Sequence, residues 1–461
     1  MSFRPCFLGI IAFTIISLGG ETFVPAQATT DFTVWKDVQN AEDVPDWARR
    51  MLIRDFRDII GIDREELLAR TLAELKDIAS DNGVVPSTRY NAILVAGQLV
   101  SVAPSPGNPP VAPVAYPNAL TYLVEVYQNP DVPHYLKYGA LLGIVRHANI
   151  GIDTVQHDTV IDLLLETVMT EYVTGEVALN STSLEPETWD WFRLTALDGL
   201  TALKTVGQDS KVVVGLLSVI NRQSLELEDL SGSQNAFTRE EWEQSRRFAE
   251  LGAKAAKTLG DLNYAEASEI DTKKMTDVFV RLTKAVCDIE HKIASDFLEP
   301  SERWETVPDP VLLLERIVIN VKMSIQSIVW GIRSSFLTGR PTNDFFFYAS
   351  LESDDPAIRR LDILLAEIIK LSTFLDEGDG TRRPVLSANI PRELQFNLTE
   401  LRDTLAQTSE VLAKILREEK EPVEREPHEK REPGTASPDT VSLDDAPPVA
   451  EAADSDTLSE D

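Results

Sequence analysis

Three of the five histidines lie in one short stretch, "VPHYLKYGALLGIVRHANIGIDTVQHD", residues 132–158. Imidazoles bind zinc and transfer protons, so this stretch is the first candidate for a metal or acid–base site. In a helix, however, the roughly 13 residues from His134 to His147 span about 20 Å, too far to share one metal ion. His147 and His157 flank a turn, but two imidazoles without cysteine or matched carboxylates make a poor zinc site. We therefore interpret all three as structural residues of a helical repeat.

A thiol and an imidazole lie four residues apart in "TKAVCDIEHKI", at Cys287 and His291. This spacing places them on one helical face, where they could form a nucleophile pair. A nucleophilic cysteine is usually mounted at a loop or a helix N-terminus, which lowers its pKa. A small core residue beside a surface histidine is the interpretation that we favour. His428 and His291 both lack a recognisable catalytic partner.

The stretch "LDEGDGTRR" places Asp376, Glu377 and Asp379 among glycines, and carboxylate oxygens of this kind suit calcium. The 12-residue calcium loop with its distal glutamate is not present, so a helix end followed by a polar loop explains the residues more simply. Sequence patterns of the serine-hydrolase elbow, the zinc protease, the phosphate loop and the dinucleotide fold are also missing. We therefore assign no catalytic, cofactor-binding or metal-ligating residue, and we expect no cofactor.

Two aromatic groups are candidates for binding rather than for catalysis. In "TWDWFRL", Trp189 and Phe192 are three residues apart and are expected to pack in a core, whereas Trp191 lies on another helical face. An exposed tryptophan there would mark the ligand surface of a helical array. The run "NDFFFYAS", Asn343–Ser350, is expected to fill the space between an N-terminal array of helical repeats and a C-terminal helix bundle, or else to form an exposed binding patch.

The N-terminus has the layout of a secretory signal peptide. Arg4 precedes an apolar run over 7–18, and the triplet Ala26, Gln27, Ala28 follows. We predict cleavage after Ala28 and export to the periplasm or the extracellular space, with no membrane span after the signal is removed. An apolar run of about 12 residues is shorter than the roughly 18 that span a bilayer, which argues against an uncleaved anchor.

The formal net charge of −31 argues against nucleic acid as a partner. Residues 421–461 carry 13 acidic and 3 basic residues, a net charge of −10, and the stretch from Pro422 onward holds six prolines and no aromatic residue. We interpret residues 422–461 as a disordered acidic tail that promotes solubility.

Between these ends, apolar residues recur every three or four positions, and alternating stretches typical of strands are nearly absent. The pattern predicts an all-α protein. The expected helices cover residues 44–58, 64–81, 86–102, 117–129, 132–148, 155–174, 188–206, 210–221, 238–261, 272–297, 309–337, 356–377 and 392–420. A proline-rich loop, 103–117, interrupts them and is expected to be extended.

One type of helix returns along the chain, with Ala-x-x-Gly in "LKYGALLGIVRHA", "WFRLTALDGLTALKTVG" and "RRFAELGAKAAKTLG", and a looser match in "RYNAILVAGQLV". Small residues one turn apart allow a neighbouring helix to approach closely. With its preceding helix and the Asn-Pro-Asp turn, the unit "ALTYLVEVYQNPDVPHYLKYGALLGIVRHA" resembles a HEAT repeat. The resemblance implies stacked antiparallel helix pairs forming a superhelix over residues 29–265, although the spacing of the repeats is longer and less regular than in most HEAT arrays.

After about residue 266 the pattern changes to longer helices, which we interpret as a bundle over 266–421. The helix 309–337 is apolar on nearly all sides, and its charges argue against a membrane span and favour a central position in the bundle. Leu401 and Leu405 belong to a seam with alternating spacings of three and four residues, as in coiled coils. Self-association through such seams is one possible role.

These observations favour an exported, non-enzymatic interaction or scaffold protein of the cell envelope. Its helical repeats would bind a protein partner whose identity the sequence does not give. The alternative is an all-helical envelope enzyme, or an enzyme accessory, that acts on a small molecule or a glycan through carboxylates that the sequence does not single out.

Overall fold

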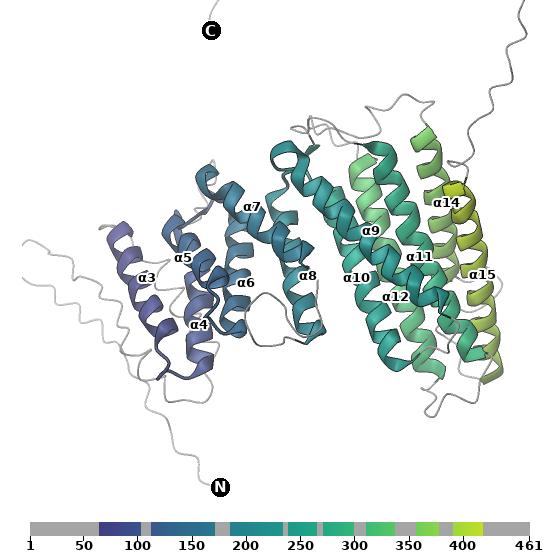
Figure 1. The fold of residues 1–461 in the computed structure, drawn as a ribbon, viewed down its shortest axis with the longest axis horizontal. Coiled ribbons are helices and arrows are strands. Elements are labelled where there is room, and N and C mark those ends of the chain that lie inside the picture. Colours follow the sequence, from purple (N-terminus) through teal and green to yellow (C-terminus); the bar gives the residue numbers. More distant parts are fainter. Residues whose placement is uncertain are drawn as a thin grey trace, which may run out of the picture. The chain divides into compact units, whose positions relative to one another are not determined.

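The computed structural model describes residues 64–102, 112–170, 185–233, 238–264, 271–298, 310–336, 356–377 and 391–417. These residues form twelve α-helices and almost no strand, so the predicted all-α class is confirmed for them (Figure 1). The helices are α3 Arg64–Ser80, α4 Pro86–Ala96, α5 Pro117–Gln128, α6 His134–Ile150, α7 Thr154–Met169, α8 Pro186–Leu203, α9 Lys211–Gly232, α10 Arg239–Asp261, α11 Thr272–Leu298, α12 Pro310–Phe336, α14 Pro356–Glu377 and α15 Pro391–Arg417. Within the described ranges no helix is long and apolar enough to cross a membrane.

Local sequence signals set several helix starts. Proline occupies the first turn of α4, α5 and α8, where its missing N–H costs no hydrogen bond. At the start of α10, the Thr238 side chain accepts from the Glu241 backbone N–H, and the Glu241 carboxylate accepts from the Thr238 backbone N–H. This capping box satisfies N–H groups that the helix itself leaves without partners.

Two predicted elements differ most from the structure. The helix expected over 86–102 ends at Ala96, and β1 Val100–Val102 then pairs antiparallel with β2 Val114–Ala115. The end of the proline-rich loop is thus a short strand, because Leu99 and Tyr116 turn inward and join the core. The helix expected over 210–221 continues to Gly232, since its buried stripe extends through Ser224, whose hydroxyl donates to the Ile220 carbonyl.

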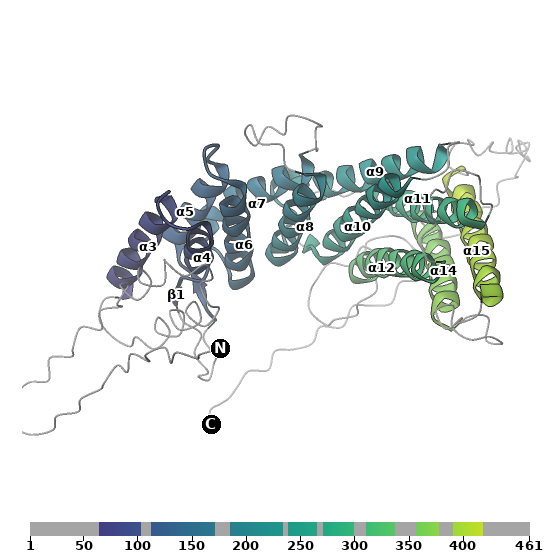
Figure 2. The same cartoon turned by 90° about the horizontal axis from the view of Figure 1, so that it is seen from below.

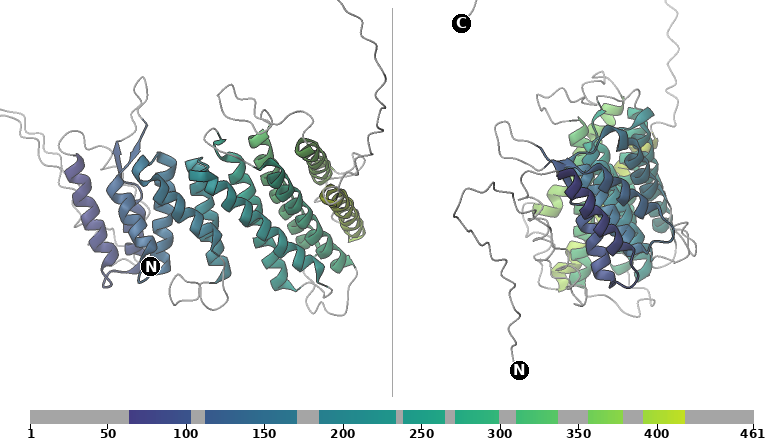
Figure 3. Two further views of the ribbon diagram at one scale, coloured as in Figure 1. Left: turned by 45° about the horizontal axis from the view of Figure 1, so that its top comes forward. Right: turned by 90° about the vertical axis from the view of Figure 1, so that its left-hand side faces the viewer.

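Helix α3 contacts α4, α5 contacts α6, α7 contacts α8, and α9 contacts α10. The even-numbered helices also pack on one another in order, from α4 through α6, α8 and α10 to α12. In Figure 2, helices α7, α9 and α11 lie on one side of α8, α10 and α12, and Figure 3 shows successive helices side by side. The predicted domain boundary, between residues 265 and 266, lies outside the residues that the structure describes.

Neighbouring even-numbered helices run parallel. Arg247 of α10 pairs with Asp190 of α8, and Lys254 pairs with Asp198, so the partners advance together along both helices. In the odd-numbered row, Arg281 of α11 donates to Asn221 of α9 at 2.7 Å. Nearer the C-terminal ends of both helices, Lys292 of α11 donates to the carbonyl of Ser233, just after α9. Helices α9 and α11 therefore also run parallel.

The packing changes at α15, which lies antiparallel to α11. His291 of α11 contacts the Arg402 carbonyl of α15, and Asp288, one turn before His291, contacts Ser409, two turns after Arg402. The seams predicted on α14 and α15 are buried within the chain. Leu401 and Leu405 have no exposed surface, and the other seam residues are also buried: Leu361, Leu364, Ile368, Leu371, Leu375, Leu398, Thr408, Leu412 and Ile415. The seams therefore serve packing inside this chain.

Two glycine pairs mark the closest helix contacts. A Cβ added to Gly97, just after α4, would lie less than 3.0 Å from the Cα of Gly143 on α6. A Cβ on Gly260 of α10 would lie equally close to the backbone of Gly331 on α12. The predicted close approach at Gly143 is therefore observed, whereas Gly199 faces the Leu164 and Val145 side chains rather than a backbone.

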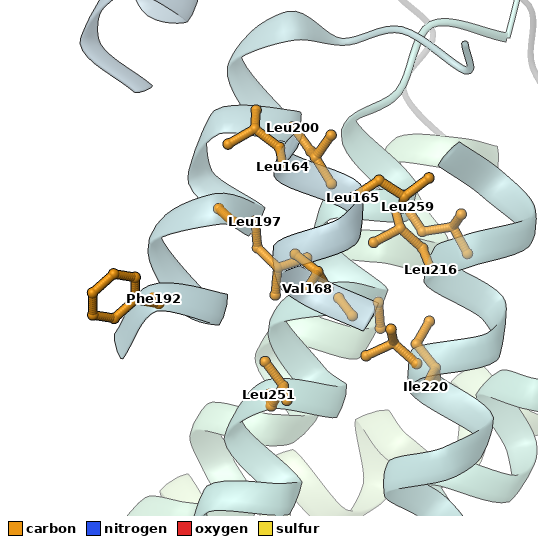
Figure 4. Close-up of a cluster of buried hydrophobic side chains, with 14 of the residues drawn as sticks. Leu164, Leu165, Val168, Phe192, Leu197, Leu200, Leu216, Ile220, Leu251 and Leu259 are labelled. Atoms are coloured by element: carbon orange, nitrogen blue, oxygen red, sulfur yellow. The ribbon is translucent and has the colours of Figure 1, made fainter. Parts of the chain in front are cut away.

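One apolar core runs through the described helices, from Leu68 in α3 to Ile415 in α15. Figure 4 shows part of it, where leucines from α7, α8, α9 and α10 meet. Leu164, Leu197 and Leu216, from three of these helices, are completely buried. Burying each such side chain contributes on the order of 2 kcal/mol, so the helices are held as one packed body.

Candidate interaction surface

The tryptophans of α8 divide as the helical spacing predicts. Trp189 and Phe192 are buried, and their rings stack with centroids 5.6 Å apart. The Trp189 indole donates to the Thr170 carbonyl at 3.2 Å, which fixes the start of α8 against the end of α7. Trp191 is 60% exposed. A large indole left in water on a firmly packed helix is the feature expected of a binding surface.

Trp191 is one of the exposed residues of α8, α10 and α12 that we name together the even-helix face. Its residues are Glu187, Trp191 and Asp198 on α8, Arg246 and Glu250 on α10, and Arg316, Ile319, Met323 and Trp330 on α12. At 100° per residue, the exposed stripe of α10 lies between the side that contacts α8 and the side that contacts α12. The three helices therefore present these residues on the same side of the molecule.

Ion pairs between neighbouring helices hold this face. Arg247 of α10 lies 3.4 Å from both Glu187 and Asp190 of α8. Arg316 of α12 pairs with Glu243 of α10 at 3.2 Å, and its guanidinium lies over the Trp242 ring, 4.8 Å from the centroid. The more exposed of these pairs add little stability, but they fix the positions of the charged side chains.

Asp190 is the ionisable group most affected by this arrangement. Burial raises its pKa, and the nearby Arg193 and Arg247 oppose that rise. Arg193 lies 3.6 Å from the carboxylate and also donates from Nε to the Val168 carbonyl. Asp190 therefore links the buried side of the first turns of α8 to the ion pairs of the even-helix face.

The apolar end of the face is formed by α12. The predicted central position of this helix is wrong for one of its sides, because Ile319, Met323 and Trp330 are 46%, 60% and 54% exposed. An apolar side chain is buried only where a neighbouring helix covers it, and α10, α11, α14 and α15 leave this stripe uncovered. The Trp330 indole donates to Asp261 at 2.8 Å, which holds the ring in place.

The structure does not bring the three histidines of the first candidate stretch into a metal site. Within the described ranges no group of three or more histidine, cysteine or carboxylate side chains is placed to hold a metal ion. His147 is completely buried, and neither of its ring nitrogens has a hydrogen-bond partner. Burial, with a smaller effect from Arg146, lowers its pKa to about 4. His134 begins α6 and His157 lies in the first turns of α7.

The thiol–imidazole pair agrees with the structural interpretation. Cys287 is completely buried, and burial raises the pKa of its thiol far above its ordinary value. His291, one turn further on, is partly exposed, and its Nδ1 lies 3.1 Å from the Arg402 carbonyl oxygen. A protonated thiol without access to solvent does not attack a substrate.

Two further candidates cannot be placed. The side chains of Asp376 and Glu377, together with Asp379, lie outside the described residues. The same holds for the aromatic run Asn343–Ser350, the expected helix 44–58, the signal peptide and the tail 422–461.

Sequence reasoning missed two buried ionisable residues. Glu290 is 1% exposed and lies on the apolar stripe of α11, and burial raises its pKa to about 8 although a hydrogen bond with Asn320 opposes the rise. Lys137, also 1% exposed, lies on the buried stripe of α6, and burial lowers its pKa against the effect of Asp131. Both occupy positions where helical spacing predicts an apolar residue, which is the signal that could have identified them.

Comparisons with protein-family models, with curated proteins and with solved structures gave no match for this chain.

Proposed function

We propose that this protein is an exported, non-enzymatic interaction or scaffold protein of the cell envelope, which binds a protein partner through the even-helix face. The signal-peptide pattern of residues 1–28 supports export to the periplasm or the extracellular space. The strongly acidic composition supports a protein partner rather than nucleic acid.

We further propose that α3 to α10, which lie within residues 29–265, form an irregular HEAT-like array. Helix pairs that place parallel neighbours in the same row are the arrangement expected of an α-solenoid, and such arrays offer extended binding surfaces. Support comes from the pairs Asp190–Arg247 and Asp198–Lys254, which keep α8 and α10 in parallel register, and from the glycine contact of Gly97 with Gly143. The row of even-numbered helices would be the binding side.

The observation that carries the proposal is the exposure of Trp191 and Trp330 on one face. Tryptophan is enriched at the energetic centres of protein interfaces. Both helices that carry these residues are held by interhelical bonds, and the Trp330 indole is also held by its hydrogen bond to Asp261, which lowers the entropic cost of binding there.

The carboxylates of the even-helix face favour binding over acid–base chemistry. Glu187 and Asp198 each pair with an arginine or lysine of a neighbouring helix, and Glu250 pairs with Arg246 on its own helix. A general acid or base must exchange a proton with a substrate, and a carboxylate held by a guanidinium or ammonium group is ill suited to that. The same pairs are well suited to orienting a charged partner.

The test is affinity recovery of the chain from Thr29 onward from its native envelope fraction. We expect a protein partner at constant stoichiometry, and we expect Trp191→Ala to reduce its recovery about tenfold or more, as interface tryptophans commonly do. The matched control is Val155→Ala on α7, because Val155 is 85% exposed and lies outside the even-helix face.

Recovery of the protein alone, or with a glycan, would contradict the proposal and favour the enzyme alternative. Equal loss with both variants would show that the partner does not use this face. A parallel recovery without residues 422–461 shows whether the acidic tail takes part.

A further inference from the structure

A basic residue recurs at one position of the even-numbered helices. It lies three residues before the alanine of each repeated small-residue unit, at Arg89 in α4, Lys137 in α6, Arg193 in α8 and Arg246 in α10. The first three of these residues are buried. A buried basic side chain needs hydrogen-bond partners, because it has lost its contact with water. The partners at this position can therefore be compared from one helix pair to the next.

The two buried arginines make the same contact. Arg89 donates from Nε to the carbonyl of Ala79, the last residue but one of α3, at 2.8 Å. Arg193 donates from Nε to the carbonyl of Val168, the last residue but one of α7, at 3.0 Å. The final carbonyls of a helix have no partner within it and attract a cation. Each arginine therefore ties the last turn of an odd-numbered helix to the helix that follows it.

Lys137 of α6 makes no such tie. Within the described part of the chain its amine has no hydrogen-bond partner, although the residue is only 1% exposed. Burial lowers the pKa of Lys137, and Asp131 in the turn after α5 opposes this effect, so the amine lies near that turn. The equivalent carbonyl belongs to Tyr127, the last residue but one of α5. The Tyr127 hydroxyl lies 2.7 Å from that of Thr167, so its side chain joins α5 to α7 rather than to α6.

Arg246 of α10 occupies the same repeat position without being buried. Its side chain is 44% exposed, and it pairs with Glu243 and Glu250 on its own helix. An exposed cation keeps its contact with water whether or not it meets a carbonyl, so it has little influence on the preceding helix. Arg246 is therefore the natural control for the three buried residues.

We propose that the last turn of α5 is an opening point of the array, which separates locally from α6 while the neighbouring pairs stay closed. In the closed state the Lys137 amine is unbonded and out of water, which is unfavourable for a polar group. Opening returns the amine to water, whereas opening at Arg89 or Arg193 breaks a hydrogen bond. Local openings of this kind occur well below the free energy of global unfolding. This inference concerns motion within the array and does not rest on the function proposed above.

Hydrogen–deuterium exchange of the chain from Thr29 onward, measured by mass spectrometry, tests the proposal. The backbone amides of residues 125–128 report on the last turn of α5, and those of residues 166–169 report on the last turn of α7. After correction for intrinsic rates, we expect 125–128 to exchange about tenfold faster than 166–169, the effect of one hydrogen bond to a charged group. Lys137→Arg supplies the missing Nε donor and should slow exchange of 125–128 by about the same factor.

Arg193→Lys is the reciprocal variant, because it removes the donor at α7. It should speed exchange of 166–169 about tenfold and leave 125–128 unchanged. Arg246→Lys makes the same change at the exposed position and should alter neither segment. Lys137→Met removes the amine and keeps an unbranched stem, and it should slow exchange of 125–128. This variant decides the question even where the longer arginine side chain does not fit.

Three results would overturn the proposal. The first is exchange of 125–128 that is no faster than that of 166–169 in the unaltered chain. The second is faster exchange of 125–128 in Lys137→Met, which would mean that the amine is bonded in the folded chain. The third is a change that spreads equally over all helices, since this would reflect global stability rather than a local opening. Partner recovery that depends on Trp191 is decided separately from each of these.

Discussion

The parallel row from α4 to α12 and the antiparallel packing of α15 on α11 bring helices together with different residues. In the parallel row the closest contacts are backbone to backbone, at Gly97 with Gly143 and at Gly260 with Gly331. Between α11 and α15, the buried residues are instead leucines at alternating steps of three and four, such as Leu401 and Leu405. At the α4–α6 and α10–α12 contacts, parallel stacking therefore depends on missing side chains, whereas the antiparallel packing of α15 on α11 depends on interlocking ones.

The two regions also bury ionisable groups of opposite character. The parallel row contains His147 on α6, whose charged form is cationic, whereas α11 contains Glu290, whose charged form is anionic. Burial disfavours the charged form of both groups. Acid should therefore weaken the first region, and base should weaken the second.

The largest expected effect is that of pH through Glu290. Its pKa is about 8 in the folded chain and close to its ordinary value of 4.5 when unfolded. The folded state thus holds a proton that the unfolded state has lost, so stability is full below about pH 4.5 and falls as pH rises through 8. The shift corresponds to about 5 kcal/mol at most.

Urea unfolding at pH 5 and at pH 9 measures this effect. We expect Glu290→Gln to lose less stability than the unaltered chain between these two conditions. Glu315→Gln, a change of the same kind at an exposed position of α12, is the control and should retain the full loss. If Glu290→Gln and the unaltered chain lost the same stability between pH 5 and pH 9, ionisation of this carboxyl would not lower the free energy of unfolding.

His147 should respond to pH in the opposite sense. Its pKa is about 4 when folded, below the ordinary 6.5, so the unfolded state binds more protons between these values. Its contribution is therefore present above about pH 6.5 and is lost as pH falls through 4, by about 3 kcal/mol. Because neither ring nitrogen has a partner, His147→Leu removes no hydrogen bond.

Unfolding of His147→Leu at pH 5 and at pH 7.5 checks this prediction. We expect the variant to gain stability relative to the unaltered chain mainly at pH 5. His157→Gln, at a partly exposed position of α7, should show no such difference. A variant that is equally destabilised at both pH values would mean that packing, rather than protonation, decides the role of the ring.

The contrast between the two regions also explains what the sequence could predict. The seam of Leu398, Leu401 and Leu405 repeats regularly, so its helix and buried face were predictable from spacing alone. The close contact at Gly331 was not predictable from spacing, because a single glycine in an apolar helix does not show which helix packs against it. Only the structure places α10 there. The end of α4 was missed for a similar reason, since β1 forms only with β2, more than ten residues later.

The candidate surface was predictable in part. Spacing separated Trp191 from Trp189 and Phe192 correctly, because helical geometry alone places them on different sides. The exposure of Met323 and Trp330 was not predictable, since an apolar residue on α12 looks the same whether or not a neighbour covers it. Only the three-dimensional packing of α10, α11, α14 and α15 leaves that stripe open.

The smallest expected effect distinguishes a backbone contact from a side-chain contact within the parallel row. Gly331→Ala introduces a methyl group less than 3.0 Å from the Ala256 carbonyl oxygen of α10, and neither backbone can move without separating the helices. We expect a loss of about 2–3 kcal/mol in the free energy of unfolding. Gly199→Ala meets the end of the Leu164 side chain at 2.8 Å, which can rotate away, so a loss of about 1 kcal/mol is expected. Gly232→Ala, with no atom within 4 Å, is the control in the same urea titrations. Equal losses at Gly331 and Gly199 would mean that the parallel helices tolerate separation, and that glycine does not set their spacing.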